Sequence, residues 1–182
     1  MSTPVTNRRP QPDKVIVDLA NYAHAYRPTS KLAFETARLT LIDSLACAFE
    51  ALAYPDCTKL LGPVVPGTIV PNGARVPGTN YVLDPVTAAF NAGALIRWLD
   101  FNDAFYGRTV IHPSDNIGAI LMTADWLSRT RHAAGQAPIT MRDVLSAIIK
   151  AYEVQGGLAL ENGFTAAGLD HTILVKIATT AA

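Results

Sequence analysis

Apolar residues recur at helical spacing along most of this 182-residue chain, and this pattern constrains the fold more than any other feature. It is clearest after Thr140, where apolar residues stand three and four positions apart and so share one helix face. These residues are Met141, Val144, Leu145, Ile148, Ile149 and Tyr152. The chain is 49% hydrophobic, which is enough for a packed core. We therefore expect an all-α fold.

The ends of the apolar segments predict where the helices begin and end. The expected helices are 13–26, 30–53, 85–100, 115–131, 140–156 and 173–182. Side chains that accept hydrogen bonds from free backbone N–H groups favour helix starts. The expected caps are Thr29 or Ser30, Asp84, Ser114 and Thr140. Gly156-Gly157 is expected to weaken or end the helix that follows Thr140.

Small residues predict where two helices come close. They gather in the helix 85–100, where short side chains allow a neighbouring helix to approach. They are Ala88, Ala89, Ala92, Gly93 and Ala94. We expect this helix to pack tightly against another.

Other segments lack helical spacing. Residues 1–12 are polar and proline-rich, and we expect a disordered lead-in there. Residues 62–83 carry repeated proline and glycine turn signals and predict a turn-rich, β-prone segment that can form a small hairpin. Residues 101–111 are expected to form a loop containing Gly107. The last helix carries no stop signal, so we expect 13–182 to be the front part of a larger helical domain.

Charge and cysteine content exclude several classes of function. Fifteen basic and fifteen acidic residues cancel, which argues against nucleic acid or an anionic membrane as a partner. No apolar run approaches the roughly 18 residues that a membrane span needs. Cys47 and Cys57 are expected to be free thiols in a reducing compartment, with Cys47 buried on an apolar helix face.

Three carboxylates and an imidazole stand within 16 residues of a chain that is only 16% charged. They are Asp100, Asp103, His112 and Asp115. Asp100 and Asp103 fall where an apolar helix is expected to end, next to the negative end of its dipole, which costs a few tenths of a kcal/mol each. They would share one face if the helix continues that far. This local misfit points to chemistry.

His112 is the strongest candidate for proton transfer, because histidine takes and gives protons near neutral pH. One carboxylate is expected to orient His112, and the other to act as acid or base if burial raises its pKa. Arg97 and Arg108 can bind a substrate carboxylate.

Plainer interpretations of the same residues stay open. His112 can be a loop hydrogen-bond partner, and Asp100 or Asp103 can pair with Arg97 or cap a turn. Asp115 can serve only as a helix cap. A hard-metal site is a further alternative, but no dense ligand spacing supports it. No glycine-rich phosphate loop is present.

Long motifs resemble those of the MmgE/PrpD family, in the branch that dehydrates 2-methylcitrate. The matching stretches are 59–63, 66–68, 70–73, 75–79, 96–103, 112–116, 124–129, 153–156, 159–162, 168–171 and 174–176. The resemblance runs from Pro12 onward. Motifs of this length and order are specific, and they separate this branch from the related aconitate decarboxylases.

The resemblance implies a cofactor-independent hydro-lyase that converts 2-methylcitrate into 2-methyl-cis-aconitate in the methylcitrate cycle of propionate catabolism. It implies a homodimer, a small tricarboxylate substrate, and neither a metal nor an iron–sulfur cluster. The family combines a large helical domain with a smaller α/β domain, and the α/β domain is absent from these residues. The cytoplasm is the expected compartment, with the mitochondrial matrix as the alternative for a eukaryotic source.

The resemblance also carries residue roles over by position. Asp100 and His112 match active-site positions, and Asp103 lies on the same motif, so all three are expected to be catalytic. The expected substrate-binding residues are Arg97, Arg108, Ser114 and His171. The sequence departs from the family pattern at Ala104, where a threonine hydroxyl is usual, and along the loop 104–111.

Two other functions compete with this one. A truncated or diverged chain would be a non-catalytic helical dimerisation module. A related lyase would act on citrate or cis-aconitate. The Ala104 change favours divergence, whereas the intact Asp100, Asp103 and His112 favour an enzyme.

Overall fold

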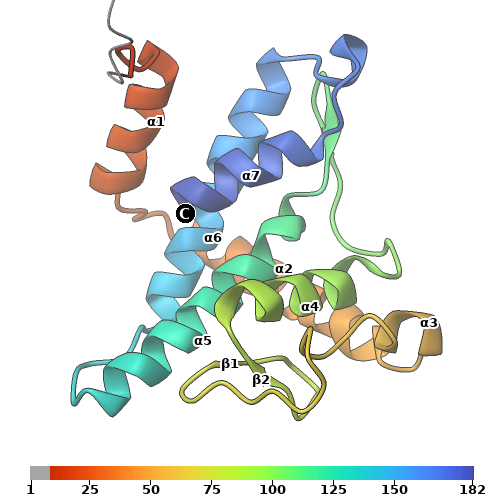
Figure 1. Ribbon diagram of the computed structural model, residues 1–182. Coiled ribbons are helices and arrows are strands. Elements are labelled where there is room, and N and C mark those ends of the chain that lie inside the picture. The colour runs from red at the N-terminus through yellow and green to blue at the C-terminus, as the bar shows by residue number, and fades with distance from the viewer. Residues whose placement is uncertain (1–8) are drawn as a thin grey trace, which may run out of the picture.

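The structure is a computed structural model that describes residues 9–182 (Figure 1). Helices account for most of these residues, which confirms the all-α prediction. The helices are α1 (Lys14–Ala25), α2 (Lys31–Ala51), α3 (Pro55–Thr58), α4 (Pro85–Arg97), α5 (Ile117–Ala133), α6 (Met141–Glu161) and α7 (Thr172–Ala181). Two short 3₁₀ helices are η1 (Pro113–Asn116) and η2 (Thr165–Ala167).

The β structure of the described residues is limited to two small antiparallel hairpins. β1 (Ala74–Arg75) pairs with β2 (Val82–Leu83), which confirms a hairpin within the turn-rich segment 62–83. β3 (Phe105–Tyr106) pairs with β4 (Val110–Ile111), where only a loop was expected.

The core lies between α2, α4, α5 and α6, and α7 covers one side of α6 (Figure 1). Large, fully buried side chains come from α4, α5, α6, α7 and the β2 strand. They include Leu83, Leu95, Ile96, Ile117, Met122, Ile148 and Leu174. Burial of this apolar surface supplies most of the favourable free energy of folding. Phe49 of α2 lies outside this core and is exposed.

The predicted close approach of helices occurs between α4 and α5. A Cβ atom on Gly118 would lie 2.7 Å from the backbone nitrogen of Gly93. The two backbones therefore meet where neither residue has a side chain. This contact fixes α5 against α4, and so places η1 beside the end of α4.

Three of the expected caps are confirmed. The Ser30 hydroxyl accepts a hydrogen bond from Ala33 N, and Asp84 accepts from the first turn of α4. Thr140 and Asp143 form a reciprocal capping box. Such caps stabilise a helix by about 1 kcal/mol each.

The predicted Ser114 cap is wrong. Ser114 lies inside η1 and is fully buried, and its hydroxyl accepts a hydrogen bond from the Asn102 amide. α5 then begins at Ile117 rather than at Asp115. Pro113 explains the difference, because a proline suits the first position of a helical turn, so the turn begins before Ser114 and Ser114 cannot cap it.

Two expected helix ends differ from the structure by three residues or more. α4 ends at Arg97, three residues before the expected end at 100. α6 continues through Gly156-Gly157 to Glu161, so these glycines do not end it. Packing explains the continuation, since Gly156 is buried in α6 against other elements and tertiary contacts override local propensity.

The hairpin β3–β4 packs against the C-terminal part of α6. Arg108 N and Thr109 N both donate hydrogen bonds to the Ala159 carbonyl. A Cβ atom on Gly107 would lie 2.6 Å from that same oxygen, so only glycine allows this approach. These contacts attach the segment between α4 and His112 to α6.

α1 is attached more lightly. It has no buried residue, and polar contacts hold it to α6. The Tyr22 hydroxyl donates to Glu153, and the Lys150 ammonium donates to the Ala23 carbonyl.

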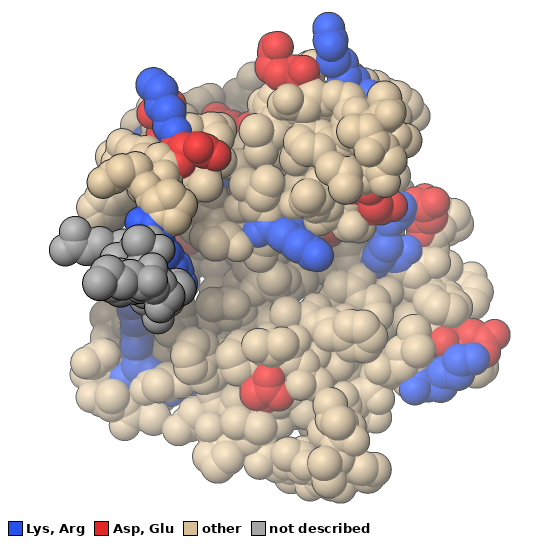
Figure 2. Space-filling model, turned by 45° about the horizontal axis from the view of Figure 1, so that its top comes forward, with Lys and Arg blue, Asp and Glu red and all other residues tan. Residues whose placement is uncertain are grey.

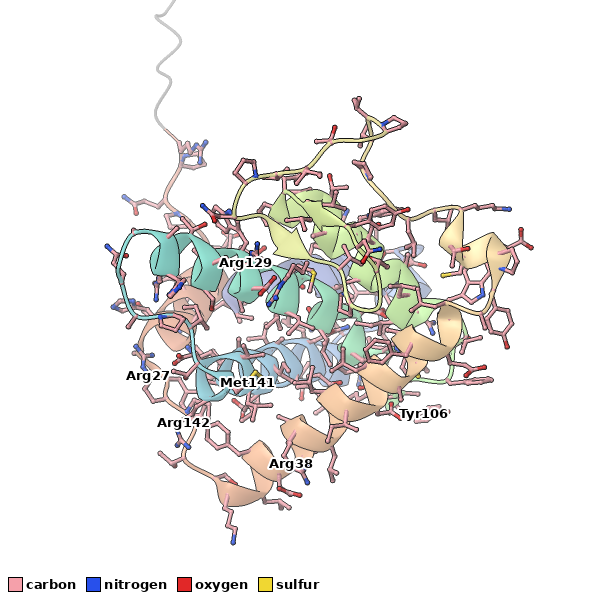
Figure 3. The ribbon with its side chains drawn as sticks, turned by 90° about the horizontal axis from the view of Figure 1, so that it is seen from below. Arg27, Arg38, Tyr106, Arg129, Met141 and Arg142 are labelled. Carbon is pink, nitrogen blue, oxygen red and sulfur yellow. The ribbon has the colours of Figure 1, made fainter. Side chains whose placement is uncertain are left out.

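A cation–π contact joins the start of α6 to α2. The Arg142 guanidinium lies 4.3 Å above the Phe34 ring of α2 (Figure 3).

The expected lead-in 1–12 lies partly outside the described residues. Residues 9–12 are exposed and precede α1 without regular structure. Among the helices of residues 9–182, none is long and apolar enough to span a membrane.

Charged side chains are sparse on the face shown in Figure 2, and most of the basic ones lie beside acidic ones. Exposed pairs of this kind join Lys14 to Asp18, Arg38 to Glu35 and Lys59 to Asp56. No single-sign surface stands out on that face, in keeping with the balanced composition.

Candidate active site

The candidate site forms where three segments far apart in sequence meet. Arg97 is the last residue of α4, His112 immediately precedes η1, and His171 immediately precedes α7. The His112 and His171 rings lie edge to face with centroids 5.7 Å apart. The two histidines expected at the site are therefore neighbours.

His112 has a defined orientation. Its Nδ1 lies 2.7 Å from the Asp103 carbonyl oxygen. A carbonyl only accepts hydrogen bonds, so Nδ1 carries a proton. In the neutral ring the lone pair then lies on Nε2, and Nε2 can accept a proton.

Both carboxylate oxygens of Asp103 accept hydrogen bonds from the chain, and its expected catalytic role stays a prediction. One of its oxygens accepts a hydrogen bond from Ser114 N at 3.1 Å, and the other accepts from the Tyr152 hydroxyl at 2.7 Å. Burial and the negative charge of Asp103 raise the pKa of Tyr152 far above its usual value. Tyr152 therefore keeps its proton and stays a donor. Asp103 thus anchors the carbonyl that orients His112.

Asp100 and Asp103 do not share a helix face, because α4 ends at Arg97. Asp100 has a left-handed backbone with φ of 55°, which is uncommon outside glycine. Its side chain is 66% exposed and pairs with Arg97. Hydrogen bonding to Arg97 lowers the pKa of Asp100. It is therefore an exposed, ionised counter-ion of Arg97.

The Arg97 guanidinium gathers three polar side chains. Besides Asp100, it donates to the Asn102 amide oxygen at 3.3 Å, and its Nε lies 3.6 Å from Asp115 Oδ1. Asn102 is buried and also donates to Ser114. Ser114, expected to bind substrate, thus lies beneath the site and supports Asn102.

Asp115 belongs to the charged cluster of the sequence, which assigned it neither a catalytic nor a substrate-binding role. Its Oδ2 lies 3.9 Å from His171 Nε2, opposite the oxygen that faces Arg97. Asp115 Oδ1 is buried and has no hydrogen-bond partner among the described residues. Burial raises the pKa of Asp115, and the nearby Arg97 and histidines only partly offset this. Its place directly after His-Pro-Ser was the available sequence signal.

A groove of about 680 Å³ opens beside these groups. Arg97, Asp115, His171 and Lys176 line it, together with Asp170. Asp170 Oδ1 lies 3.4 Å from His171 Nδ1 and accepts a hydrogen bond from Thr172 N, which lowers the pKa of Asp170. Lys176 was not predicted from the sequence, although it follows the histidine by little more than one helix turn.

Arg108 is not brought to this groove. It occupies the exposed turn of the β3–β4 hairpin, after Tyr106, which is 81% exposed (Figure 3). The sequence placed Arg108 near the acids, but the hairpin directs that turn toward the end of α6.

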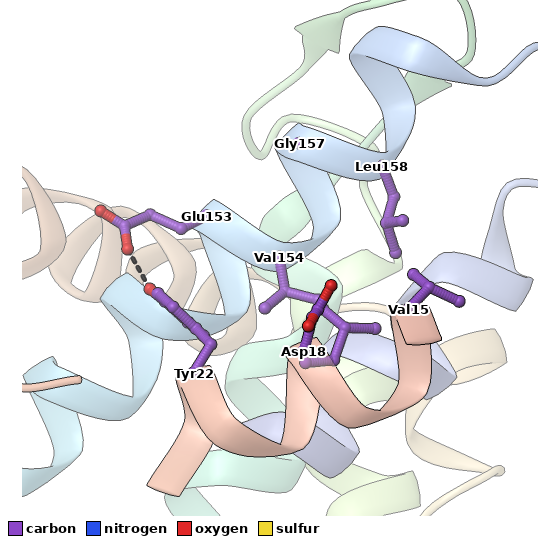
Figure 4. Close-up of a pocket in the computed structure, with 8 residues that line it drawn as sticks. Val15, Asp18, Tyr22, Glu153, Val154, Gly157 and Leu158 are labelled. Carbon is purple, nitrogen blue, oxygen red and sulfur yellow. Dashed lines mark hydrogen bonds between the residues drawn. The ribbon is translucent and has the colours of Figure 1, made fainter. Parts of the chain in front are cut away.

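A second cavity of about 320 Å³ lies between α1 and α6 (Figure 4). Its lining is mostly apolar and includes Val15, Leu19 and Val154. The hydrogen bond from Tyr22 to Glu153 closes one side. This cavity offers no basic side chain, so the groove at Arg97 suits a carboxylate ligand far better.

Other reactive groups lie elsewhere. Cys47 and Cys57 are both buried free cysteines, as expected for Cys47, and burial raises the pKa of each thiol. Within residues 9–182, no three His, Cys, Asp or Glu side chains are arranged to hold a metal ion.

Sequence comparison supports a single family. The chain is 63% identical to the 2-methylcitrate dehydratase of Cupriavidus necator over 174 residues, covering 96% of this chain and 36% of that protein. It is 61% identical to the 2-methylcitrate dehydratase of Salmonella typhimurium over 181 residues, covering 100% of this chain and 38% of the relative. It is 54% identical to the mitochondrial 2-methylcitrate dehydratase of Yarrowia lipolytica over 176 residues, covering 96% and 34%.

The chain thus spans about a third of the length of these curated relatives, between 34% and 38%. Residues 17–182 match the family described as the MmgE/PrpD N-terminal domain. This match takes in both hairpins, the groove and every residue assigned to the site above. The chain therefore belongs to the MmgE/PrpD family.

Proposed function

We propose that this chain forms part of a hydro-lyase that dehydrates 2-methylcitrate to 2-methyl-cis-aconitate. One observation carries the proposal: the oriented His112 ring touches His171, which lines a groove that Arg97 and Lys176 also line. A base next to several cationic side chains suits proton removal from a polycarboxylate. The names of the relatives support this substrate.

His112 acts as the base in this proposal. Its Nε2 takes the proton from the carbon next to a substrate carboxylate, while Asp103 and Tyr152 hold the ring through the loop. Proton transfer by a positioned side chain contributes roughly 10²–10⁴-fold to a rate. The departing hydroxyl takes a second proton and leaves as water. The exposed position of Asp100 supports a role as counter-ion to Arg97. A direct role of Asp100 in proton transfer stays a prediction.

Arg97 and His171 bind substrate carboxylates in this proposal, and Lys176 adds a second positive charge at the groove. Two positive side chains and an imidazole that can donate a hydrogen bond suit a tricarboxylate. Substrate binding by Arg108 and Ser114 stays a prediction. The chemistry needs only acid–base side chains, so we propose no cofactor and no metal.

We further propose a homodimer. Val86 and Phe90 lie on the outer face of α4 and are 78% and 62% exposed, and exposed apolar side chains on one face favour a protein partner. Sedimentation of the parent and of Phe90→Glu tests this. We expect a dimer that the variant converts to monomer, and a monomeric parent would contradict it.

The proposed setting is propionate catabolism in the cytoplasm. For a eukaryotic source we propose the mitochondrial matrix, since the Yarrowia lipolytica relative is described as mitochondrial.

The direct test of the substrate compares 2-methylcitrate, citrate and cis-aconitate. Formation of a double bond conjugated with a carboxylate is followed by ultraviolet absorbance, and cis-aconitate loss by chromatography. We expect the highest kcat/KM with 2-methylcitrate. A higher value with citrate or cis-aconitate would assign the chain to the related lyase instead. A folded chain that acts on none of them would favour the non-catalytic module.

A further inference from the structure

Dehydration needs an acid for the departing hydroxyl as well as a base, and four carboxyl groups stand near the groove. They are Asp100, Asp103, Asp115 and Asp170. The acid must reach the substrate, hold a proton and have an oxygen that is not already bonded. These three requirements separate the four groups.

Three of the four fail at least one requirement. Both oxygens of Asp103 already accept hydrogen bonds, from Ser114 N and from Tyr152. Asp100 and Asp170 are exposed, and each is held in its ionised form, by Arg97 and by the Thr172 backbone respectively. They are therefore poor proton donors.

Asp115 meets all three. It lines the groove, and its side chain is 13% exposed. Among the described residues Asp115 Oδ1 is buried and accepts no hydrogen bond, although Arg97 Nε lies 3.6 Å from it, and a buried oxygen left in this way calls for an explanation. Asp115 Oδ2 faces the His171 ring.

We propose that Asp115 is the acid that protonates the hydroxyl group leaving the substrate. This inference rests on the proposed dehydratase function and extends it by naming the acid. It also explains why Asp100 can remain outside the groove as a counter-ion.

The substrate C–H bond breaks and its proton passes to His112 Nε2. The electron pair forms the new carbon–carbon double bond as the C–O bond breaks. The leaving oxygen takes the Asp115 proton and departs as water. Asp115 is left ionised and His112 protonated, and exchange of one proton with solvent at each group restores both.

The surroundings of Asp115 fit this role. Charged and titratable groups face it from every element packed around it, namely Arg97, Asp103, His112, Tyr152 and His171. Burial is the largest influence, and it raises the pKa of Asp115. Asp115 therefore keeps its proton to a higher pH than Asp100 or Asp170. Arg97 and His171 stabilise the carboxylate that forms when the proton leaves.

The experiment compares Asp115→Asn with the parent chain and with Asp125→Asn. Asp125 lies on α5, pairs with Arg75 and is absent from the groove, so its variant controls for the loss of a half-buried carboxylate. Folding of all three is checked by circular dichroism. We expect Asp115→Asn to lower kcat by about 100-fold with little change in KM, and Asp125→Asn to keep the parent kcat. The fall in rate as pH rises through the Asp115 pKa should disappear in Asp115→Asn. A kcat close to the parent value in folded Asp115→Asn would overturn the proposal.

A second measurement tests the role of Asp115 without relying on enzyme activity. Carbon-13 NMR of the aspartate carboxyls follows each group through a pH titration, with and without 2-methylcitrate. We expect the Asp115 signal to titrate above those of Asp100 and Asp170 and to shift when 2-methylcitrate is added. An Asp115 signal that titrates with the exposed aspartates, or ignores 2-methylcitrate, would overturn the proposal. An inactive parent chain whose Asp115 signal does respond would count against the proposed function alone.

Discussion

Tyr152 donates a hydrogen bond to Asp103, and through this contact α6 fixes the loop that orients His112. The hydrogen bond from Asn102 to Ser114 also holds this loop. The β3–β4 hairpin holds it as well, through its hydrogen bonds to α6. The position of His112, the proposed base, therefore depends on Tyr152, Asn102 and Ser114, which do not line the groove.

Replacing Tyr152 by Phe should weaken both stability and catalysis. The variant leaves one Asp103 oxygen without its buried donor, which costs about 1–3 kcal/mol of unfolding free energy. The loop should loosen, and kcat should fall. Urea unfolding and kinetics check this. The control Tyr106→Phe removes a hydroxyl from an exposed ring and should change neither. Equal effects of the two variants would contradict the role given to Tyr152.

The contact between α4 and α5 predicts opposite effects of alanine at two glycines. Gly118→Ala would place a Cβ atom against the Gly93 backbone and force the helices apart, with a cost of about 1–3 kcal/mol. Gly157→Ala meets nothing within 4 Å inside α6 and should stabilise by about 0.5–1 kcal/mol. Thermal unfolding of both variants measures this. A stabilising Gly118→Ala would contradict the close contact.

Much of this architecture follows from sequence because it is local. Helical spacing and the caps Ser30, Asp84 and Thr140 depend on neighbours a few residues apart, and the structure confirms them. The small residues of α4 also indicated its tight packing.

The features that the sequence did not predict depend on long-range contacts. The hairpin β3–β4 exists because α6 offers the Ala159 carbonyl, which no local pattern around Gly107 records. The position of Asp115 between Arg97 and His171 depends on how α4 and α7 pack against η1. Because α4 ends at Arg97, Asp100 and Asp103 do not share a helix face. The sequence pattern did not locate this helix end, so it did not predict that the two carboxylates separate.

Arg97 and Arg108 should respond differently to substitution by Lys. Arg97 contacts Asp100, Asn102 and Asp115 through a planar fork that a lysine ammonium cannot reproduce. We expect Arg97→Lys to raise KM for 2-methylcitrate by about tenfold or more, corresponding to about 1.4 kcal/mol. Arg108→Lys, at the exposed hairpin turn, should raise it less. A larger effect at Arg108 would restore Arg108 as the main carboxylate-binding residue.

Asp115 should carry a stability cost that depends on pH. Because burial raises the Asp115 pKa in the folded state, folding favours the protonated form. The cost of its charge is absent below the ordinary aspartate pKa and grows as pH rises through the raised value. Asp115→Asn should therefore be more stable than the parent at neutral pH, with a difference that shrinks in acid. Urea unfolding at several pH values measures this, and a variant less stable by a constant amount at every pH would contradict it.

The most direct test of the account is the rate of 2-methylcitrate dehydration by the parent chain, His112→Ala and His132→Ala. His132 is an exposed histidine near the end of α5 and serves as the matched control. We predict turnover by the parent and His132→Ala, and a loss of roughly 10²-fold or more in His112→Ala. Equal rates in the parent and His112→Ala, with both proteins folded, would contradict it.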